Sequence, residues 1–228
     1  PTIGSFLATG GLMGIGITKP FAVLSFSLCV FVTIGIAQEW IRGTVVRHRS
    51  GENYLLAFFN LLAGNRPRYG GYVVHLAVVL LALGVTGSSF YDIEKDLTLS
   101  PGETGQVGDY TLRYITSSIE EKVDRSEMIN EIDISRGSVS LGTYYPRRDF
   151  YPAFRMASTR AAIRSTPVED LYIVPGELLS DGRAIFRVRI NPLVMWMWVA
   201  GPLLMIGVAM TLWPDRSPKS TYLRDAWG

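Results

Sequence analysis

The chain has 228 residues, 48% of them hydrophobic and 18% charged, and its formal net charge is +2. This balance gives no support for a nucleic-acid binder, and the apolar residues gather in long runs, which is typical of a membrane protein. CxxC, HExxH, GxSxG and P-loop motifs do not occur in the sequence, so self-contained thiol-exchange, hydrolase or kinase chemistry is not supported.

The first segment, residues 1–20, is apolar and contains five glycines in "GSFLATGGLMGIG". We expect an extracytoplasmic interfacial or loop segment, or the end of a preceding helix. The sequence starts "PTIGSF", without an initiator methionine, a basic region or a small-residue cleavage site. We therefore also expect the tail of a longer polypeptide or the product of a split gene.

Three apolar runs follow, each of about 20 residues and long enough to cross a hydrocarbon core roughly 30 Å thick. They predict transmembrane helices over residues 21–41, 71–90 and 192–213. Between the first two, residues 42–70 carry five arginines and one acid, Glu52. The basic residues of this segment are Arg42, Arg47, Arg49, Arg66 and Arg68.

Short arginine-rich loops stay in the cytoplasm, so residues 42–70 are predicted to be a basic cytoplasmic loop. Within it, "ENYLLAFFNLLAG" is typical of an amphipathic helix along the membrane surface. We favour a headgroup-anchoring role for the arginines over a nucleic-acid or substrate patch. Residues 91–191 are then extracytoplasmic, and residues 214–228 form a cytoplasmic tail containing Arg216, Lys219 and Arg224. The location predicted is a bacterial inner (plasma) membrane, or an equivalent organellar membrane, with several crossings.

Residues 91–191 contain most of the charged residues and several short alternating segments separated by turn sequences. Examples are "DLTLS", "YTLRYITSS", "INEIDIS", "SVSLGTYY", "EDLYIV" and "AIFRVRI". We predict a small antiparallel β-domain, a sandwich or a barrel. The stretch "YPRRDFYPAFRMASTRAAIRSTP" fits no period and is predicted to consist largely of long connections. The fold class is therefore a membrane α + β protein with three transmembrane helices and an extracytoplasmic β-domain.

Two sets of aromatic residues leave alternatives open. Trp196 and Trp198 are interpreted as interfacial belt residues, with contact to a cofactor as the alternative. The second set either docks a partner protein or packs a strand and its corner. It consists of Tyr144, Tyr145, Phe150, Tyr151 and Phe154, interleaved with Arg147, Arg148 and Arg155. The lone cysteine, Cys29, is interpreted as an apolar filler of the first span.

His75 interrupts the apolar run "NRPRYGGYVVHLAVVLLALGVTG". With a helix starting near Gly71, the ring lies roughly 6 Å inside the span, where an ionisable group is a candidate functional residue. Imidazole is a common ligand of metals, including haem iron. Gly71 and Tyr72, on the same helical face, are predicted as neighbours of a flat macrocycle. An interhelical hydrogen bond is the alternative from the residues alone. The other histidine, His48, is predicted to be a solvated loop residue.

Four blocks of the sequence, in the same order and spacing, resemble the C-terminal third of the CcmF family, the haem lyase subunit of the cytochrome c maturation system. They are "NRPRYGGYVVHLAVVLLALGVTGSSF", "LSPGETGQVGDYTLRY", "FYPAFRMASTRAAIRSTPVEDLYIV" and "RVRINPLVMWMWVAGPLLMIGVAMTLWP". The resemblance implies that His75 is an axial ligand of the iron of haem b. It also implies that the β-domain is the family's periplasmic domain.

The resemblance further implies covalent attachment of haem to the CxxCH thiols of apocytochrome c, with the b-type haem as an electron relay. The family's tryptophan-rich haem-presenting segment, its extracytoplasmic histidines and its second transmembrane histidine have no match here. The expected partners are therefore the upstream portion of the lyase, or a separate chain with the second ligand, together with a haem chaperone, apocytochrome c and membrane lipid. Two alternatives remain: a haem-free assembly or transport accessory, and a lyase paralogue specific to a nitrite reductase.

Overall fold

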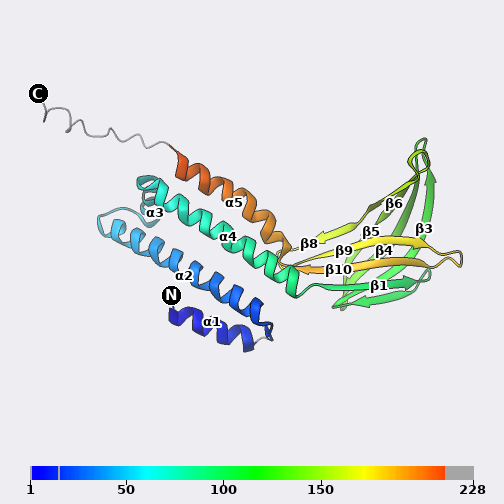
Figure 1. The fold of residues 1–228 in the computed structure, drawn as a ribbon, viewed down its shortest axis with the longest axis horizontal. Coiled ribbons are helices and arrows are strands. Elements are labelled where there is room, and N and C mark those ends of the chain that lie inside the picture. Colours follow the sequence, from blue (N-terminus) through cyan, green and yellow to red (C-terminus); the bar gives the residue numbers. More distant parts are fainter. Residues whose placement is uncertain (1, 15, 214–228) are drawn as a thin grey trace, which may run out of the picture. The chain divides into compact units, whose positions relative to one another are not determined.

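A computed structural model describes residues 2–14 and 16–213 of the chain, in which five α-helices and ten β-strands are assigned (Figure 1). The chain divides into two compact units, which we describe separately. The first contains residues 2–11, 27–80 and 199–213. The second contains residues 12–26 and 81–198, and therefore the whole β-domain. The tail predicted over residues 214–228 lies outside the described residues.

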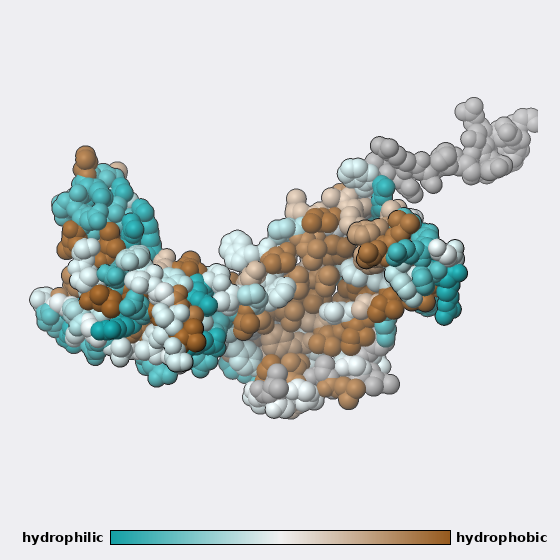
Figure 2. Space-filling model, turned by 180° about the vertical axis from the view of Figure 1, so that it is seen from behind, coloured by the Kyte–Doolittle hydropathy of each residue, from teal (hydrophilic) through white to brown (hydrophobic). Residues whose placement is uncertain are grey.

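Three helices are long and apolar enough to cross a membrane, which confirms the membrane α + β fold class. These are α2 (Pro20–Arg49), α4 (Arg66–Phe90) and α5 (Val194–Leu212). Residues Thr2–Gly14 form a short helix, α1, rather than a loop. The segment between α2 and α4 contains α3 (Tyr54–Gly64), where the sequence predicts a short helix. Apolar residues cover much of the helices, whereas polar residues dominate the visible face of the strands (Figure 2).

The helices extend further than the apolar runs that predict them. α2 continues through the arginines to Arg49, and the chain turns only at Gly51, whose φ is +97°. Asn53 then caps α3, its side chain accepting a hydrogen bond from the Leu55 amide at 3.2 Å. α4 begins at Arg66, with Pro67 in its first turn, where no amide donor is needed. His75 therefore lies nine residues after the start of α4, about 14 Å along its axis rather than 6 Å.

Small residues bring helices of the first unit together. A Cβ added to Gly70 of α4 would lie 2.8 Å from the amide nitrogen of Thr211 and 2.9 Å from the Gly207 carbonyl of α5. Gly207 faces α4 in return, because its added Cβ would lie 2.8 Å from the Val74 amide. Close backbone approach at glycines is a recurring way to pack transmembrane helices.

In the second unit, two antiparallel sheets form the β-domain (Figure 1). One sheet has the order β1-β10-β9-β8. The other has the order β2-β3-β4-β6-β7, with β5 also paired to β4. The strands are β1 (Ile93–Leu99), β2 (Thr104–Val107), β3 (Tyr110–Glu121), β4 (Ser126–Arg136), β5 (Val139–Tyr144), β6 (Arg147–Tyr151), β7 (Met156–Arg160), β8 (Ala162–Ser165), β9 (Glu169–Leu178) and β10 (Ala184–Pro192).

The two sheets share one hydrophobic core, built from alternate residues of their strands. In β10, Phe186, Val188 and Ile190 are buried in this core. Arg187, between them, points to the other face and pairs with Asp96 of β1 at 2.9 Å. All six alternating segments named from the sequence are strands. The stretch from 145 to 167, predicted to be largely connections, instead contributes β6, β7, β8 and the 3₁₀ turn Pro152–Phe154.

Candidate functional site

One face of α4 is exposed in the described part of the chain. His75, Val78 and Leu81 lie on it, and Arg68 continues it toward the start of the helix. Buried residues, among them Val73 and Ala77, occupy the opposite side. In an α-helix each residue turns by about 100°, so these positions form a single stripe.

The His75 ring has a defined hydrogen bond on one side only. Its Nδ1 lies 2.7 Å from the carbonyl oxygen of Gly71, one turn earlier in α4. A carbonyl can only accept, so Nδ1 carries the proton in this contact, and Nε2 of the neutral ring keeps its lone pair. No hydrogen bond or ion pair to Nε2 is found among the described residues. This is the arrangement that a ligating imidazole needs, with one nitrogen oriented by a carbonyl and the other free for a metal.

Gly71 and Tyr72, predicted as neighbours of a flat macrocycle, lie about one turn before His75 on α4. A Cβ built on Gly71 would meet no atom within 4 Å, so the space in front of this residue is open in the first unit. Tyr72 is half-buried, and its hydroxyl oxygen accepts a hydrogen bond from Nε of Arg68 at 3.2 Å. A flat group can therefore approach the helix over Gly71 and pack its edge near Tyr72.

Arg68 is a member of the site that sequence reasoning did not single out. Besides Tyr72, it contacts α2, because one terminal guanidinium nitrogen donates to Oε2 of Glu39 at 2.6 Å. The Arg68 side chain nevertheless stays 50% exposed. A signal for Arg68 was present in the sequence, since it lies seven residues before His75 and so on the same helical face. The partner Glu39 had no such signal, because the contact depends on how α2 packs on α4.

The other metal-ligand residue types do not join this site. His48 lies in the last turn of α2, where its Nδ1 is 2.8 Å from the Glu52 carbonyl and its ring stacks on Tyr54 at 3.7 Å between centroids. It is therefore a packed helix residue, and the prediction of a solvated loop residue is wrong. Cys29 is buried in α2 with its thiol near the Val79 carbonyl. Within residues 2–14 and 16–213, no cluster of three or more His, Cys, Asp or Glu residues is arranged to hold a metal ion.

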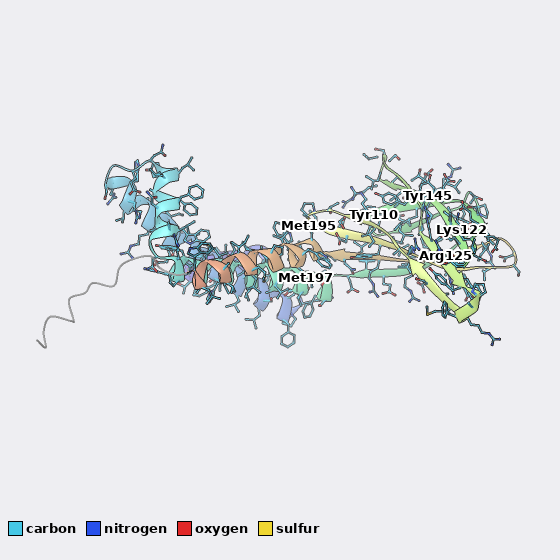
Figure 3. The ribbon with its side chains drawn as sticks, turned by 90° about the horizontal axis from the view of Figure 1, so that it is seen from above. Tyr110, Lys122, Arg125, Tyr145, Met195 and Met197 are labelled. Atoms are coloured by element: carbon cyan, nitrogen blue, oxygen red, sulfur yellow. The ribbon has the colours of Figure 1, made fainter. Side chains whose placement is uncertain are left out.

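The aromatic and arginine set of the β-domain is divided between two hollows. Phe150 and Arg148 line a hollow of about 380 Å³ between β6 and β9, where Arg148 lies 3.6 Å from Glu177. Tyr151 and Phe154 line another, of about 370 Å³, beside the β3–β4 turn. The remaining members of the set, Tyr144, Tyr145, Arg147 and Arg155, line neither of these hollows. Figure 3 labels Tyr145 in the β-domain, together with Lys122 and Arg125 of the second hollow.

Acidic residues of the β-domain pair with arginines. Asp149 of β6 is fully buried and lies 2.9 Å from Arg160 on the neighbouring strand β7. The buried Glu127 of β4 lies opposite Asp149 and pairs with Arg125 at 2.6 Å. Hydrogen bonding by Arg187 lowers the pKa of Asp96 on the outer face of β1. These pairs involve charges that have partners, so they indicate a structural role rather than acid–base chemistry.

At the start of α5, Trp196 anchors the helix to the β-domain. Its indole nitrogen donates a hydrogen bond to the Pro167 carbonyl at 2.9 Å. Trp198, two residues later, is 76% exposed. Met195 and Met197, which alternate with these tryptophans in the sequence, are labelled at the start of α5 in Figure 3. Both tryptophans lie within the first turn and a half of α5, where interfacial belt residues are expected.

The fold thus defines a class of protein: a membrane protein in which a two-sheet antiparallel β-domain is inserted between apolar helices, one of which carries an exposed histidine. Residues 90–192 match the family model described as the CcmF C-terminal beta-sandwich. This match covers the β-domain almost from end to end.

Relatives extend the similarity to the helices. The chain is 28% identical over 208 residues to the cytochrome c-type biogenesis protein CcmF of Pseudomonas aeruginosa, covering 90% of this chain and 30% of that protein. It is 28% identical over 159 residues to the probable cytochrome c-type biogenesis protein NrfE of Escherichia coli, covering 70% of this chain and 29% of that protein.

A solved structure titled cytochrome c heme lyase CcmF has the same fold, with a TM-score of 0.72 and 25% identity, and covers 93% of this chain and 34% of that structure. The chain is therefore similar in sequence and fold to the C-terminal portion of CcmF. It spans about a third of the length of the relatives that it matches.

Proposed function

We propose that the chain is part of a membrane haem lyase in cytochrome c biogenesis, in which His75 is one axial ligand of a b-type haem. The β-domain is its extracytoplasmic scaffold. The proposal joins the similarity to CcmF with a property of this chain, the orientation of the His75 ring.

The hydrogen bond between His75 Nδ1 and the Gly71 carbonyl carries the ligand assignment. It fixes the ring and leaves Nε2 facing outward from the exposed side of α4. An exposed imidazole within a transmembrane helix costs free energy unless a group in the assembled protein binds it. Nε2 of His75 would hold the iron of a haem, and the open space over Gly71 would leave room for the macrocycle.

A b-type haem, when bound, supplies reversible one-electron transfer. This chain's own contribution is to hold the imidazole. Packing of α4 against α5 at Gly70 and Gly207 fixes the helix that carries His75. A fixed helix would hold the His75 imidazole in one orientation for the iron of the haem.

The second axial ligand has to come from outside the described residues. His48 is held by the Glu52 carbonyl and by Tyr54, and both lie at the α2–α3 turn. The upstream portion of the lyase, or a separate chain, therefore provides the opposite ligand. A haem chaperone and apocytochrome c complete the proposed assembly.

The proposed topology places the β-domain outside the cytoplasm. Arg42, Arg47 and Arg49 cluster in the last two turns of α2, and Arg66 and Arg68 lie in the first turn of α4. Excess arginine marks the cytoplasmic end of a span. The opposite end of α4 leads directly into β1, so the β-domain follows on the other side of the membrane.

The experiment is to replace His75 with Ala in the complete assembly and to record reduced-minus-oxidised absorption spectra after purification. We expect the b-type bands to disappear while the assembly keeps its elution volume. The matched control is His48→Ala, which should leave the bands unchanged. Full b-type bands in His75→Ala would show that the ligand assignment is wrong.

The same spectra test the haem-free accessory alternative, because an assembly without a Soret band in the unaltered protein would favour it. The lyase paralogue specific to a nitrite reductase is a second candidate. The match to NrfE at 28% identity keeps it in view. Complementation of strains lacking either lyase would distinguish the two.

A further inference from the structure

We infer that Arg68 and Tyr72 bind the propionates of the proposed haem, so that α4 supplies both an axial ligand and the anchor for the macrocycle's acidic edge. This inference rests on the proposed function of His75. It concerns different residues and a different part of the cofactor.

Arg68 lies on the same face of α4 as His75. Arg68 precedes His75 by seven residues, which corresponds to two helical turns, about 10 Å along the axis, and a rotation of only about 20°. Haem carries its two propionates together on one edge, away from the iron. A cation that binds them must therefore share the helical face of the axial ligand and lie some distance along it. Arg68 meets both conditions.

The Arg68 guanidinium is held in one orientation. Tyr72 accepts from Nε of Arg68 at 3.2 Å, and Glu39 of α2 accepts from Nη2 at 2.6 Å. These two contacts hold the guanidinium plane in one place. Nη1 has no hydrogen-bond partner among the described residues, and the side chain is half-exposed, so two donor hydrogens remain for a ligand.

Arg68 and Tyr72 both have hydrogen-bond donors available for a carboxylate. The Tyr72 hydroxyl is used as an acceptor by Arg68, so its own proton is available for a second acceptor. Arg68 Nη1 and Tyr72 O–H together form a pair of donors on the face of α4 that carries His75. A carboxylate accepts from two such donors, and charge-assisted hydrogen bonds of this kind are stronger than neutral ones.

Arg66, the other arginine in the first turn of α4, is not placed to bind the propionates. Arg66 is nine residues before His75, a rotation of about 180°, and so lies on the opposite side of α4. There it lines a hollow of about 480 Å³ with Phe59, Leu62 and Trp213. Arg66 is therefore a matched control for Arg68. It has the same charge, lies on the same helix and is at a similar distance from His75 along the helix axis.

The test compares Arg68→Gln, Arg66→Gln and Arg68→Lys in the complete assembly, with a redox titration of the b-type haem as the readout. A positive charge near the propionates stabilises ferrous haem. At a fixed potential, Arg68→Gln should therefore lower the ratio of ferrous to ferric haem between about three- and tenfold. Arg66→Gln should leave this ratio unchanged. Arg68→Lys, which keeps the charge, should recover at least half of the effect.

Tyr72→Phe provides a second, milder variant that removes only the hydroxyl and should shift the ratio in the same direction. Equal ratios in Arg68→Gln and Arg66→Gln, whether unchanged or shifted alike, would overturn the inference while leaving His75 as a ligand. Retention of the b-type bands in His75→Ala would instead overturn the proposed function, and the Arg68 inference with it.

Discussion

The close approach of α4 and α5 offers a sharp test of the helix packing that fixes His75. Replacing Gly70 with Ala adds a Cβ that would lie 2.5 Å from Oγ1 and 2.8 Å from the amide nitrogen of Thr211, and 2.9 Å from the Gly207 carbonyl. Two of these three atoms belong to the backbone, so a rotamer change cannot relieve the contact. The helices must move apart by at least about 0.6 Å to restore ordinary van der Waals distances.

Two opposing contributions determine how Gly70→Ala changes the free energy of unfolding. Overpacking of a tight contact costs about 1–3 kcal/mol, whereas Ala is favoured over Gly in a helix by about 1 kcal/mol. Gly70→Ala should therefore lower the free energy of unfolding by up to about 2 kcal/mol. Gly71→Ala is the matched control, since its added Cβ meets nothing within 4 Å, and it should be neutral or stabilising by up to about 1 kcal/mol.

The assay is unfolding of the purified chain in mixed micelles of mild detergent and increasing dodecyl sulfate, followed by tryptophan fluorescence. Adding Gly207→Ala to Gly70→Ala should cost less than the sum of the two single changes, because both glycines serve the same contact. If Gly70→Ala and Gly71→Ala had equal stability, the close approach of α4 and α5 would be refuted.

Three further predictions concern the haem face, the core and the surface of the protein. Gly71→Val should abolish b-type absorption in the assembly by filling the open space beside His75, whereas Gly201→Val, also in open space, should not; full absorption in both would contradict the role of Gly71. Tyr110 is buried, and its hydroxyl donates a hydrogen bond to Glu169 at 2.8 Å. Burial raises the pKa of Tyr110 above its usual value. The contribution of the neutral Tyr110 hydroxyl to stability is therefore complete below pH about 10 and is lost as the pH rises through the folded-state pKa. Tyr110→Phe should therefore lower the free energy of unfolding at neutral pH by about 1–3 kcal/mol and flatten its alkaline decline, and an unchanged hydrogen-exchange profile against pH would count against this coupling. A photocrosslinker at Tyr145, which is 51% exposed, should give no adduct with a haem chaperone under maturation conditions if the β-domain is a scaffold, and a specific adduct would favour a docking surface.

The sequence predicted the three spans because an uninterrupted run of about 20 apolar residues is typical of a transmembrane helix. It did not predict where the helices end. Arg47 and Arg49 are good helix formers, but they carry no hydropathy signal, so the continuation of α2 to Arg49 was invisible. The same reason hid the start of α4 at Arg66, five residues before the apolar run. Neither boundary affects which helix carries His75.

In the β-domain, the strands with strict alternation were found and the irregular ones were missed. Pro146 and Pro152 flank β6 and interrupt the period, and β7 and β8 are edge strands with few buried side chains. β6 and β7 join their sheet because β6 pairs with β4, from which it is separated in the chain by β5, and β7 pairs with β6; β8 joins the other sheet by pairing with β9. Such non-local pairing leaves little trace in a local pattern.

At the site, His75 was predicted because an imidazole interrupts the apolar run of residues 71–90, and its face was predicted from helical spacing. The ion pair between Arg68 and Glu39 was not, since it joins two helices 29 residues apart in the sequence. Helical periodicity places residues on a face of one helix. It does not say which neighbour covers that face.

A density map of the complete assembly, determined with its cofactors, is the most direct test of His75 as a haem ligand. We expect a tetrapyrrole lying over Gly71, with Nε2 of His75 bonded to its iron and the propionate edge directed toward Arg68. A map in which the His75 ring faces only acyl chains, or donates to a carbonyl of a neighbouring helix with no tetrapyrrole beside it, would contradict the assignment of His75 as a haem ligand.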